Sequence, residues 1–509
     1  MKRANKKTLK KTPVAKKNKS LKNPKKSNNY LLNIFSNIMK FICRIPLGLI
    51  FRRIIKTILI CFCSLVIILF LFLLCRTRSP LSDVFTTGRI SILKDRPANI
   101  TRDIIVDMAP QFGSGGIKTL TQALVTDIAK KRPNWRLLML VAKDHQHGYN
   151  FQKTPNVKLI EINHFLLFFV LMEQFFKIKS FSIFQNKLIQ LLYYDLIFCD
   201  GKCDLVWDPI GFTSYSNFSN VPRISTIHDT AWFDITPKLL GTSLNILRSK
   251  ICQKNAIRLS KKIITVSKFS QNRICDKFKV SKDFVKHIPI KLATQAYSNV
   301  DMTKSKIVLT NYNLKSQKYF IFCSGWSGHK NHGNLIKAFN KFAQKNSDIK
   351  LILVGKHPSI FESRPIEEFS SDRVIIAGFV PDEELGILLK NALAFIHPSV
   401  YEGFGMPIIE AMANGIPVAC SNVASLPEVA GSAALFFDPF DVNSMTQAMH
   451  SLADDPLLRK SLIQKGYEQA KKYSDRDAMV DEYIRVMEEV MHENDLKKLS
   501  SQTNILTNY

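Results

Sequence analysis

Two glutamates, Glu402 and Glu410, stand eight positions apart around a glycine-rich turn that could bind phosphate. Pro407 suits the start of a helix, and Gly415 predicts its end. The turn before this helix, Gly403-Phe404-Gly405-Met406, would offer free backbone N–H groups with the positive end of the helix behind them, an arrangement that holds phosphate. Because ionised carboxylates accept hydrogen bonds from paired O–H groups, one of these two side chains could reach a sugar while the other reaches ribose hydroxyls.

The surrounding string, HPSVYEGFGMPIIEAMANGIPV followed by SNVASLPEVAGSAALFFDPFD, resembles the E-x7-E region of family-4 retaining glycosyltransferases, which have the GT-B fold. The resemblance implies that Glu410 holds the nucleotide ribose and that Glu402 contacts the donor sugar. It also implies that the backbone of Phe404, Gly405 and Met406 surrounds the sugar and diphosphate. The alternative is that both glutamates are only acids favoured near a helix start by its dipole.

A second segment, SGWSGHKNHGNLIKAF at Ser324–Phe339, resembles the strand–loop–helix that carries a basic residue to the diphosphate in this family. Lys330 is the matching position, and its charge would neutralise the leaving diphosphate in the transition state. Many members add an arginine in this loop, whereas this chain has Trp326 and His329 there. Lys330 is therefore the one fixed cation expected at the diphosphate, unless His329 shares the role.

Three features nearer the N-terminus fit the same family. Glycines in QFGSGG, which ends with Gly115 and Gly116, allow a close backbone approach to a ligand between a strand and a helix, although such a run can also be only a turn. The resemblance implies that Gly115 and Gly116 meet the donor phosphates and the acceptor, and that His228, in STIHD, hydrogen-bonds the donor sugar. Ser267, in ITVSKFSQNRI, is interpreted as a structural helix N-cap.

The resemblance implies transfer with retention of anomeric configuration, in which Lys330 and the helix N-terminus assist departure of the nucleotide and the acceptor attacks from the same face. We expect a mannose-like hexose, a nucleotide-diphosphate sugar donor and a membrane-proximal glycan or lipid-linked acceptor. No metal is expected, because the acids of Asp475-Arg476-Asp477 lie where a helix begins and serve there as caps and dipole partners. The alternative function is a catalytically inactive GT-B protein that binds or acts as a scaffold at the membrane.

Short apolar runs alternate with helical patterns from about Asn99, which is typical of a parallel-sheet α/β fold. The ten predicted strands are Ile104–Met108, Leu137–Val141, Leu205–Trp207, Ile224–Ile227, Ile263–Val266, Tyr319–Cys323, Leu351–Val354, Val374–Ile376, Ala394–Ile396 and Pro417–Cys420.

Ten strands are more than a single sheet would be expected to contain. The polar stretch Ala296–Lys318 is interpreted as a linker between two groups of strands. We therefore predict two Rossmann-like lobes facing a cleft, with ligands beyond the carboxyl ends of the strands. The acceptor lobe would span 99–300 and the nucleotide-sugar lobe 318–475. The resemblance implies that a helix at 476–495 crosses back to the first lobe.

The N-terminal region predicts membrane attachment. The chain has a net charge of +31, and its first 56 residues hold 17 Lys or Arg and no acid. Residues 1–29 are predicted to be a disordered basic tail, and 30–75 a membrane-associated region in which Thr57–Cys75 is long and apolar enough to span a bilayer. A stalk at 76–98 would follow. Anionic lipid is the expected partner of the tail, rather than nucleic acid, since the tail lacks aromatic residues for base stacking.

Membrane topology is left open by the sequence. The tail is predicted to be cytoplasmic, and one span would put the lobes on the opposite side, whereas a hairpin or an embedded segment would return them to the cytoplasmic face, which is slightly favoured. The segment His164–Leu192 combines an apolar run with interleaved Lys and Phe, so it is either an interfacial segment or an ordinary buried helix.

Overall fold

The computed structural model describes the chain from Arg96 onwards in one compact unit, Arg89–Tyr509. The basic tail, the predicted span Thr57–Cys75, the stalk up to residue 95 and His164–Leu192 lie outside the described residues, so these interpretations remain predictions. None of the helices in the part that is described has the length and apolarity needed to cross a membrane. The described residues are 96–108, 116–142, 151, 154–162, 203–212, 221–236, 243–292, 300–346, 348–355 and 372–506.

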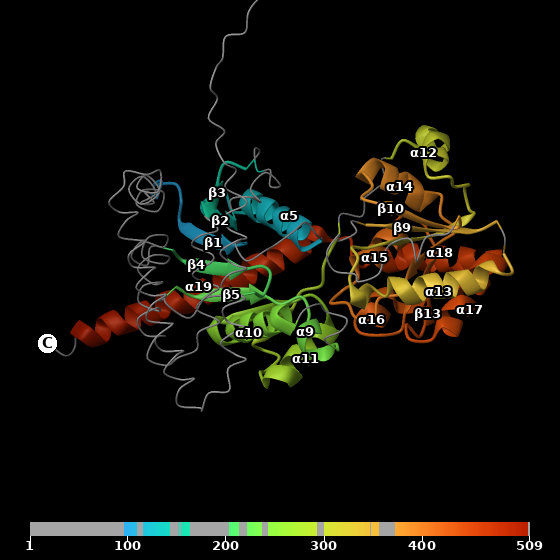
Figure 1. Cartoon of the computed structure of the whole chain (residues 1–509). Coiled ribbons are helices and arrows are strands. Elements are labelled where there is room, and N and C mark those ends of the chain that lie inside the picture. Colours follow the sequence, from blue (N-terminus) through green and yellow to red (C-terminus); the bar gives the residue numbers. More distant parts are fainter. Residues whose placement is uncertain are drawn as a thin grey trace, which may run out of the picture. The chain divides into compact units, whose positions relative to one another are not determined.

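Two parallel sheets form the two Rossmann-like lobes that the sequence predicts (Figure 1). The N-terminal sheet has the order β3-β2-β1-β4-β5-β6-β7 and the C-terminal sheet the order β10-β9-β8-β11-β12-β13. The N-terminal strands are β1 Arg102–Asp107, β2 Trp135–Ala142, β3 Val157–Ile162, β4 Leu205–Asp208, β5 Arg223–Thr226, β6 Lys262–Thr265 and β7 Val285–His287. The C-terminal strands are β8 Tyr319–Cys323, β9 Lys350–Val354, β10 Val374–Gly378, β11 Ala394–His397, β12 Val418–Ser421 and β13 Ala434–Phe437.

All ten predicted strands are confirmed, with ends that differ by at most two residues, and the described residues contain three more strands. The three additional strands are β3, β7 and β13, and each is an edge of its sheet. Edge strands are half-covered and can be short or polar, so VKLIEI and VKH lack the continuous apolar run of a central parallel strand.

Helices complete each lobe, and several begin at side-chain caps. Ser267 accepts a hydrogen bond from the N–H of Ser270 at 3.0 Å, which confirms its predicted N-cap role, and Asp441 and Asp455 cap α17 and α18. The N-terminal helices are α5 Gly116–Lys131, α9 Ala231–Asp234, α10 Ser243–Leu259 and α11 Lys268–Phe278. The C-terminal helices are α12 Ser305–Asn311, α13 His332–Ala343, α14 Asp382–Lys390, α15 Met406–Ala413, α16 Leu426–Ala430, α17 Val442–Asp454 and α18 Pro456–Lys471.

The polar stretch predicted as a linker contains helix α12. Val308 and Leu309 of this helix are buried in the core of the C-terminal lobe, and α12 packs on α14. A run of three apolar residues among polar ones was too weak a signal to predict this packing. The described part of the stretch therefore belongs largely to the C-terminal lobe.

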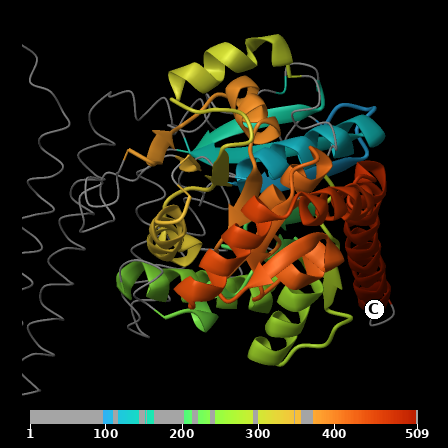
Figure 2. The same ribbon diagram turned by 90° about the vertical axis from the view of Figure 1, so that its right-hand side faces the viewer.

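The last helix, α19 Arg476–Leu506, packs on the N-terminal lobe (Figure 2). Its buried residues, among them Tyr483 and Met487, share a core with β1, β2 and β4. The Tyr483 ring lies 5.5 Å from that of Trp207. Arg476 also pairs with Asp127 of α5 at 2.6 Å, so the final segment of the chain is fastened to the first lobe.

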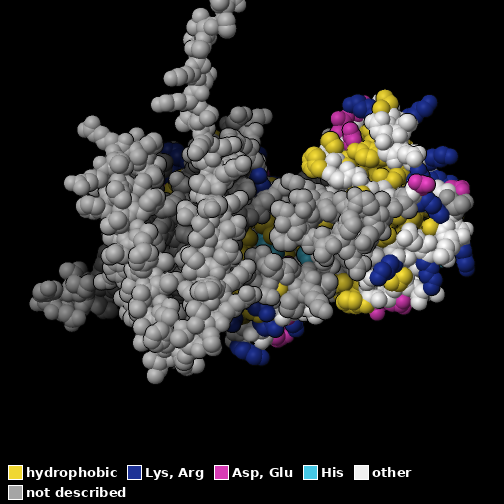
Figure 3. Space-filling view, viewed as in Figure 1, with side chains coloured by type: hydrophobic (Ala, Val, Ile, Leu, Met, Phe, Trp, Pro, Cys, Tyr) yellow, Lys and Arg dark blue, Asp and Glu magenta, His cyan; other side chains and the backbone are white. Residues whose placement is uncertain are grey.

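Charged side chains of the C-terminal lobe are dispersed over the face shown in Figure 3, where Lys and Arg groups alternate with acidic and hydrophobic ones. Several of this lobe's lysines are paired with acids. Lys304 lies 2.6 Å from Glu383, and Lys318 lies 3.5 Å from Asp348.

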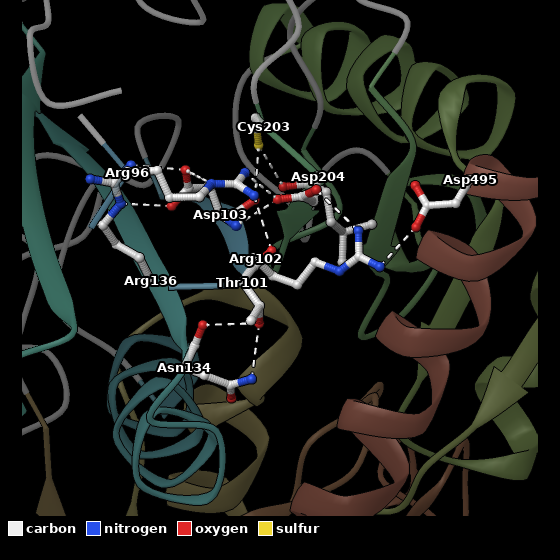
Figure 4. A network of polar contacts seen from close by, with 10 residues as sticks. Arg96, Thr101, Arg102, Asp103, Asn134, Arg136, Cys203, Asp204 and Asp495 are labelled. Carbon is white, nitrogen blue, oxygen red and sulfur yellow. Dashed lines mark hydrogen bonds and ion pairs between the residues drawn. The ribbon is translucent and has the colours of Figure 1, made fainter. Parts of the chain in front are cut away.

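A network of three arginines and three aspartates fastens the amino-terminal edge of the first sheet (Figure 4). The fully buried carboxylate of Asp103 accepts from Arg136 Nε at 2.6 Å and from Arg96 Nε at 3.0 Å. Asp204 joins Arg96 and Arg102, and Arg102 reaches Asp495 of α19 at 2.8 Å. This edge is opposite to the carboxyl ends of the strands, where α/β folds bind their ligands.

Candidate active site

The loop between β11 and α15 carries Glu402 and the turn that precedes the helix. Gly405 is the residue before α15, with φ of 97°, and a Cβ there would lie 2.7 Å from Leu426 Cδ2, so only glycine fits. The first residues of α15 have no helical partners for their N–H groups, and Pro407 within the first turn has no N–H to satisfy. Phe404, Gly405 and Met406 therefore place backbone at the positive end of a helix.

Glu402 lies in a polar cluster on this loop. Lys330 Nζ contacts its Oε1 at 2.7 Å, and His397 Nε2 contacts the same oxygen at 3.1 Å. Burial would raise the pKa of Glu402, but the Lys330 charge and the His397 hydrogen bond hold that pKa well below its usual range. Glu402 is thus ionised at neutral pH, and Lys330 is next to it rather than in solvent.

The loop that carries Lys330 is tied to the Glu402 loop by main-chain contacts. The N–H of Val400 donates to the carbonyl of His329 at 2.8 Å. Asn331 adopts a left-handed conformation with φ of 62°, and its Nδ2 donates to the carbonyls of Pro398 at 3.1 Å and Pro439 at 2.8 Å. These bonds fix the approach of Lys330 to Glu402.

His329 does not add a second cation. Burial and the neighbouring Lys330 charge lower the pKa of His329 to about 4, so its imidazole is neutral at pH 7. Trp326, the other residue in the place of the missing arginine, is buried and stacks on His332 with the ring centroids 4.2 Å apart. Lys330 is accordingly the cation that this loop brings to the site.

Glu410 lies four residues into α15 and is half-buried. No side chain or N–H among the described residues donates a hydrogen bond to its carboxylate. Burial, with a smaller contribution from the negative charge of Asp382, raises the pKa of Glu410 to about 7. The carboxylate is therefore available to hydroxyl donors and changes its charge near neutral pH.

His228 follows β5 in the other lobe and lies against the Glu402 loop. A Cβ on Gly403 would come within 2.3 Å of the His228 carbonyl oxygen, so the two backbones are in contact. His228 Nε2 donates to the Pro209 carbonyl at 2.9 Å, and burial lowers the pKa of His228. The neutral ring thus offers only Nδ1, a hydrogen-bond acceptor, to a ligand.

The predicted phosphate glycines are only partly described. Gly115 lies outside the described residues, whereas Gly116 is the first residue of α5. A Cβ on Gly116 would lie 2.4 Å from Met406 Cε, so the start of α5 touches the start of α15. Two segments predicted to bind the donor, one from each lobe, therefore meet.

The structure adds residues that the sequence did not single out. Asp229, next to His228, has a pKa raised first by burial and further by the charge of Glu402. Tyr401 OH donates to Asp234 Oδ2 of the other lobe at 2.7 Å. Glu428 of α16 accepts from the N–H groups of Lys268 and Phe269 at 2.8 and 3.0 Å. Each partner is more than 100 positions away, so no local pattern revealed these contacts.

Asp475, one of the two acids near the start of α19, has the capping role that was predicted. Asp475 Oδ1 accepts from the N–H of Ala478 at 2.9 Å, and Asp477 pairs with Lys131 at 3.3 Å. Across the described ranges, no group of three or more His, Cys, Asp or Glu side chains is arranged to hold a metal ion.

The part of the C-terminal lobe that carries this site matches a known protein family. Residues 310–469 match the family described as Glycosyl transferases group 1. This glycosyl transferases group 1 domain contains Lys330, Glu402 and Glu410 and most of the C-terminal lobe. The N-terminal lobe lies outside the matched residues.

Two curated proteins are similar to this chain in sequence. The chain is 35% identical over 221 residues to the O-antigen chain mannosyltransferase B of Escherichia coli, an alignment that covers 42% of this chain and 57% of that protein. It is 28% identical over 245 residues to the MMP alpha-(1->4)-mannosyltransferase of Mycolicibacterium hassiacum, which covers 47% of this chain and 56% of that protein. The chain thus spans little more than half the length of these two relatives.

Solved structures share the two-lobed GT-B architecture. A sucrose-phosphate synthase from Thermosynechococcus elongatus matches with a TM-score of 0.58 at 17% identity, covering 77% of this chain and 100% of that one. Anabaena HepE, solved in complex with UDP and glucose, matches with a TM-score of 0.57 at 16% identity, covering 76% and 100%. These similarities establish the fold around the glycosyl transferases group 1 domain.

Proposed function

We propose that this chain is a retaining family-4 glycosyltransferase that moves a mannose-like hexose from a nucleotide-diphosphate sugar to a membrane-proximal glycan or lipid-linked acceptor. The observation that carries the proposal is the grouping of Lys330, Glu402 and the N-terminus of α15, with Glu410 in the same helix. A cation, a helix N-terminus and two carboxylates match the charges and hydroxyls of such a donor.

Each group has a role in this reaction. As the bond between the sugar and the diphosphate breaks, negative charge grows on the departing phosphate, and Lys330 together with the α15 N–H groups stabilises it. Glu410 accepts from the ribose hydroxyls, and Glu402 accepts from a hydroxyl of the sugar. His228 contributes its Nδ1 as an acceptor from the opposite lobe. The acceptor attacks from the face on which the diphosphate departs.

The choice of sugar and nucleotide rests on relatives. Two curated relatives are named as mannosyltransferases, which favours mannose, and a structural neighbour was solved with UDP and glucose. GDP-mannose and UDP-sugars are therefore the first donors to compare.

Donor profiling with the purified full-length chain tests the proposal. We expect turnover of at least one nucleotide sugar, unaffected by EDTA, and its loss in Glu410→Ala and Lys330→Ala. Lys337→Ala and Glu493→Ala change exposed residues away from the loops of the site and should remain active. Donor binding without turnover would favour a binding scaffold instead, and unchanged donor binding and turnover in both site variants would refute the assignment.

The membrane association is part of the proposal. Deleting Met1–Asn29 should weaken binding to vesicles that contain phosphatidylglycerol at low salt, while turnover of a soluble donor stays unchanged. Protease protection on either side of residue 76 would show whether the lobes share the cytoplasmic side with the tail.

A further inference from the structure

His397 and Lys330 both contact the same oxygen of Glu402. His397 Nε2 lies 3.1 Å and Lys330 Nζ 2.7 Å from Oε1. Among the described residues, no donor contacts Oε2. Because an ionised carboxylate only accepts hydrogen bonds, His397 Nε2 carries the proton in this contact. Oε1 of Glu402 thus accepts from two donors, and Oε2 is available to a ligand.

The two donors differ in their freedom to move. His397 is the last residue of β11, its side chain is 1% exposed, and its ring packs against Phe322 and Phe395 with centroids 5.6 and 5.9 Å away. Lys330 ends a 3₁₀ turn, and its side chain is 20% exposed at the end of a four-carbon stem. Withdrawing the imidazole would open a cavity in a packed core, whereas the ammonium can turn by rotating its own side chain.

The neighbourhood of His397 also fixes its tautomer. Nδ1 is buried without a hydrogen-bond partner among the described residues. A proton on Nδ1 would have no hydrogen-bond acceptor among the residues that the structure describes, and this favours the tautomer that carries its proton on Nε2. The main-chain carbonyl of His397 accepts from Ser421 Oγ at 3.3 Å, which further fixes its position.

We propose that His397 is the positioning residue that keeps Glu402 aligned while Lys330 moves from this carboxylate to the donor diphosphate. The inference rests on the proposed function, because that function requires Lys330 at the diphosphate. A diphosphate carries more negative charge than one carboxylate, so it competes for the ammonium. After the exchange, the Nε2–H of His397 holds Oε1, and Oε2 faces the sugar.

The matched pair His397→Leu and His397→Gln tests this role in the full-length chain. Leucine keeps apolar packing and removes the donor, whereas the Nε2 of glutamine can replace the imidazole N–H. With the best nucleotide sugar, we expect kcat to fall 10- to 100-fold in His397→Leu and to recover at least tenfold in His397→Gln. Calorimetric affinity for GDP and UDP alone should stay within twofold of wild type in both variants and fall at least tenfold in Lys330→Ala.

Other outcomes separate the two proposals. A wild-type chain that binds no nucleotide and turns over no nucleotide sugar overturns the proposed function and this inference together. An active wild type with an equally active His397→Leu overturns only the inference, and so does a His397→Leu that loses GDP or UDP affinity as Lys330→Ala does. If His397→Leu does not fold, the positioning role of His397 is tested by the kcat of His397→Gln and by side-chain 15N NMR of the wild-type protein. The proton on His397 Nε2 must persist when GDP or UDP is added. Loss of this proton would refute the positioning role of His397.

Discussion

The hydroxyl of Tyr401 in the C-terminal lobe donates to Asp234 of the N-terminal lobe at 2.7 Å. Tyr401 directly precedes Glu402, and Asp234 is held in place by Arg273, so the contact joins the Glu402 loop to the opposite lobe. Burial opposes ionisation of Asp234, but its hydrogen bonds, first from Arg273, lower its pKa to about 2. An ionised acceptor makes this a charge-assisted hydrogen bond between the lobes.

Tyr401→Phe should therefore weaken closure of the lobes and spare the nucleotide site. The ring would keep its edge-on contact with Phe269, 5.6 Å away, while a hydrogen bond worth about 1.5–3 kcal/mol is lost. We expect turnover to fall roughly tenfold or more, with GDP or UDP affinity nearly unchanged. Tyr467→Phe, at a half-exposed tyrosine of α18, is the matched control. Unchanged turnover in Tyr401→Phe would contradict this role.

Nucleotide affinity should rise with pH because of Glu410. Its pKa of about 7 means that the carboxylate is roughly 10% ionised at pH 6 and roughly 90% at pH 8. Only the ionised form accepts from both ribose hydroxyls, so calorimetry should show affinity for GDP or UDP rising up to about ninefold over this range. Glu410→Gln should bind more weakly and retain only the pH dependence of the ligand's own phosphates. An equal slope in both proteins would exclude Glu410 as the titrating group.

The same carboxylate should make the fold less stable at high pH. The folded pKa of Glu410 lies above its model value of 4.5, so the folded state holds the proton that the unfolded chain has released. Stability is then lost as pH rises from about 4.5 through 7. Glu410→Gln should gain about 2 kcal/mol more, relative to wild type, at pH 8 than at pH 5. Thermal unfolding at both pH values, with Glu493→Gln as an exposed control, would measure this difference.

Local patterns predicted the central strands and the segments that bear Lys330, Glu402 and Glu410. Continuous apolar runs and a long motif consist of residues adjacent in the sequence, so they can be recognised without the fold. The contacts that hold those loops were not predictable in the same way. Tyr401 meets a residue 167 positions away, and Glu428 meets one 160 positions away. His397 looked like an ordinary strand end, since only the folded chain shows its ring beside Glu402.

Gly403→Ala should separate the lobes at the site. The added Cβ would lie 2.3 Å from the His228 carbonyl oxygen, a backbone atom that cannot rotate away. We expect a loss of turnover of about 100-fold, and small-angle scattering should show a larger radius of gyration. Gly466→Ala is the control, because its Cβ would make ordinary contacts of 3.4 Å or more with Met412. Normal turnover in Gly403→Ala would mean that the two backbones need not touch during the reaction.

Asp103→Asn should destabilise the N-terminal lobe without altering the chemistry. Asp103 is fully buried and holds Arg136, whose side chain is 3% exposed, so the substitution removes a negative charge that lies 2.6 Å from a buried guanidinium. Removing one partner of a buried ion pair costs about 3–5 kcal/mol. Asp495→Asn makes the same chemical change at the exposed end of the network, where the carboxylate is 37% exposed and the pair with Arg102 is worth about 1 kcal/mol or less. Thermal unfolding should therefore separate the two variants clearly.

Turnover per folded molecule should remain near wild type in both, because this network lies at the sheet edge opposite the site. A large loss of turnover in folded Asp103→Asn would show instead that this edge is coupled to the reaction.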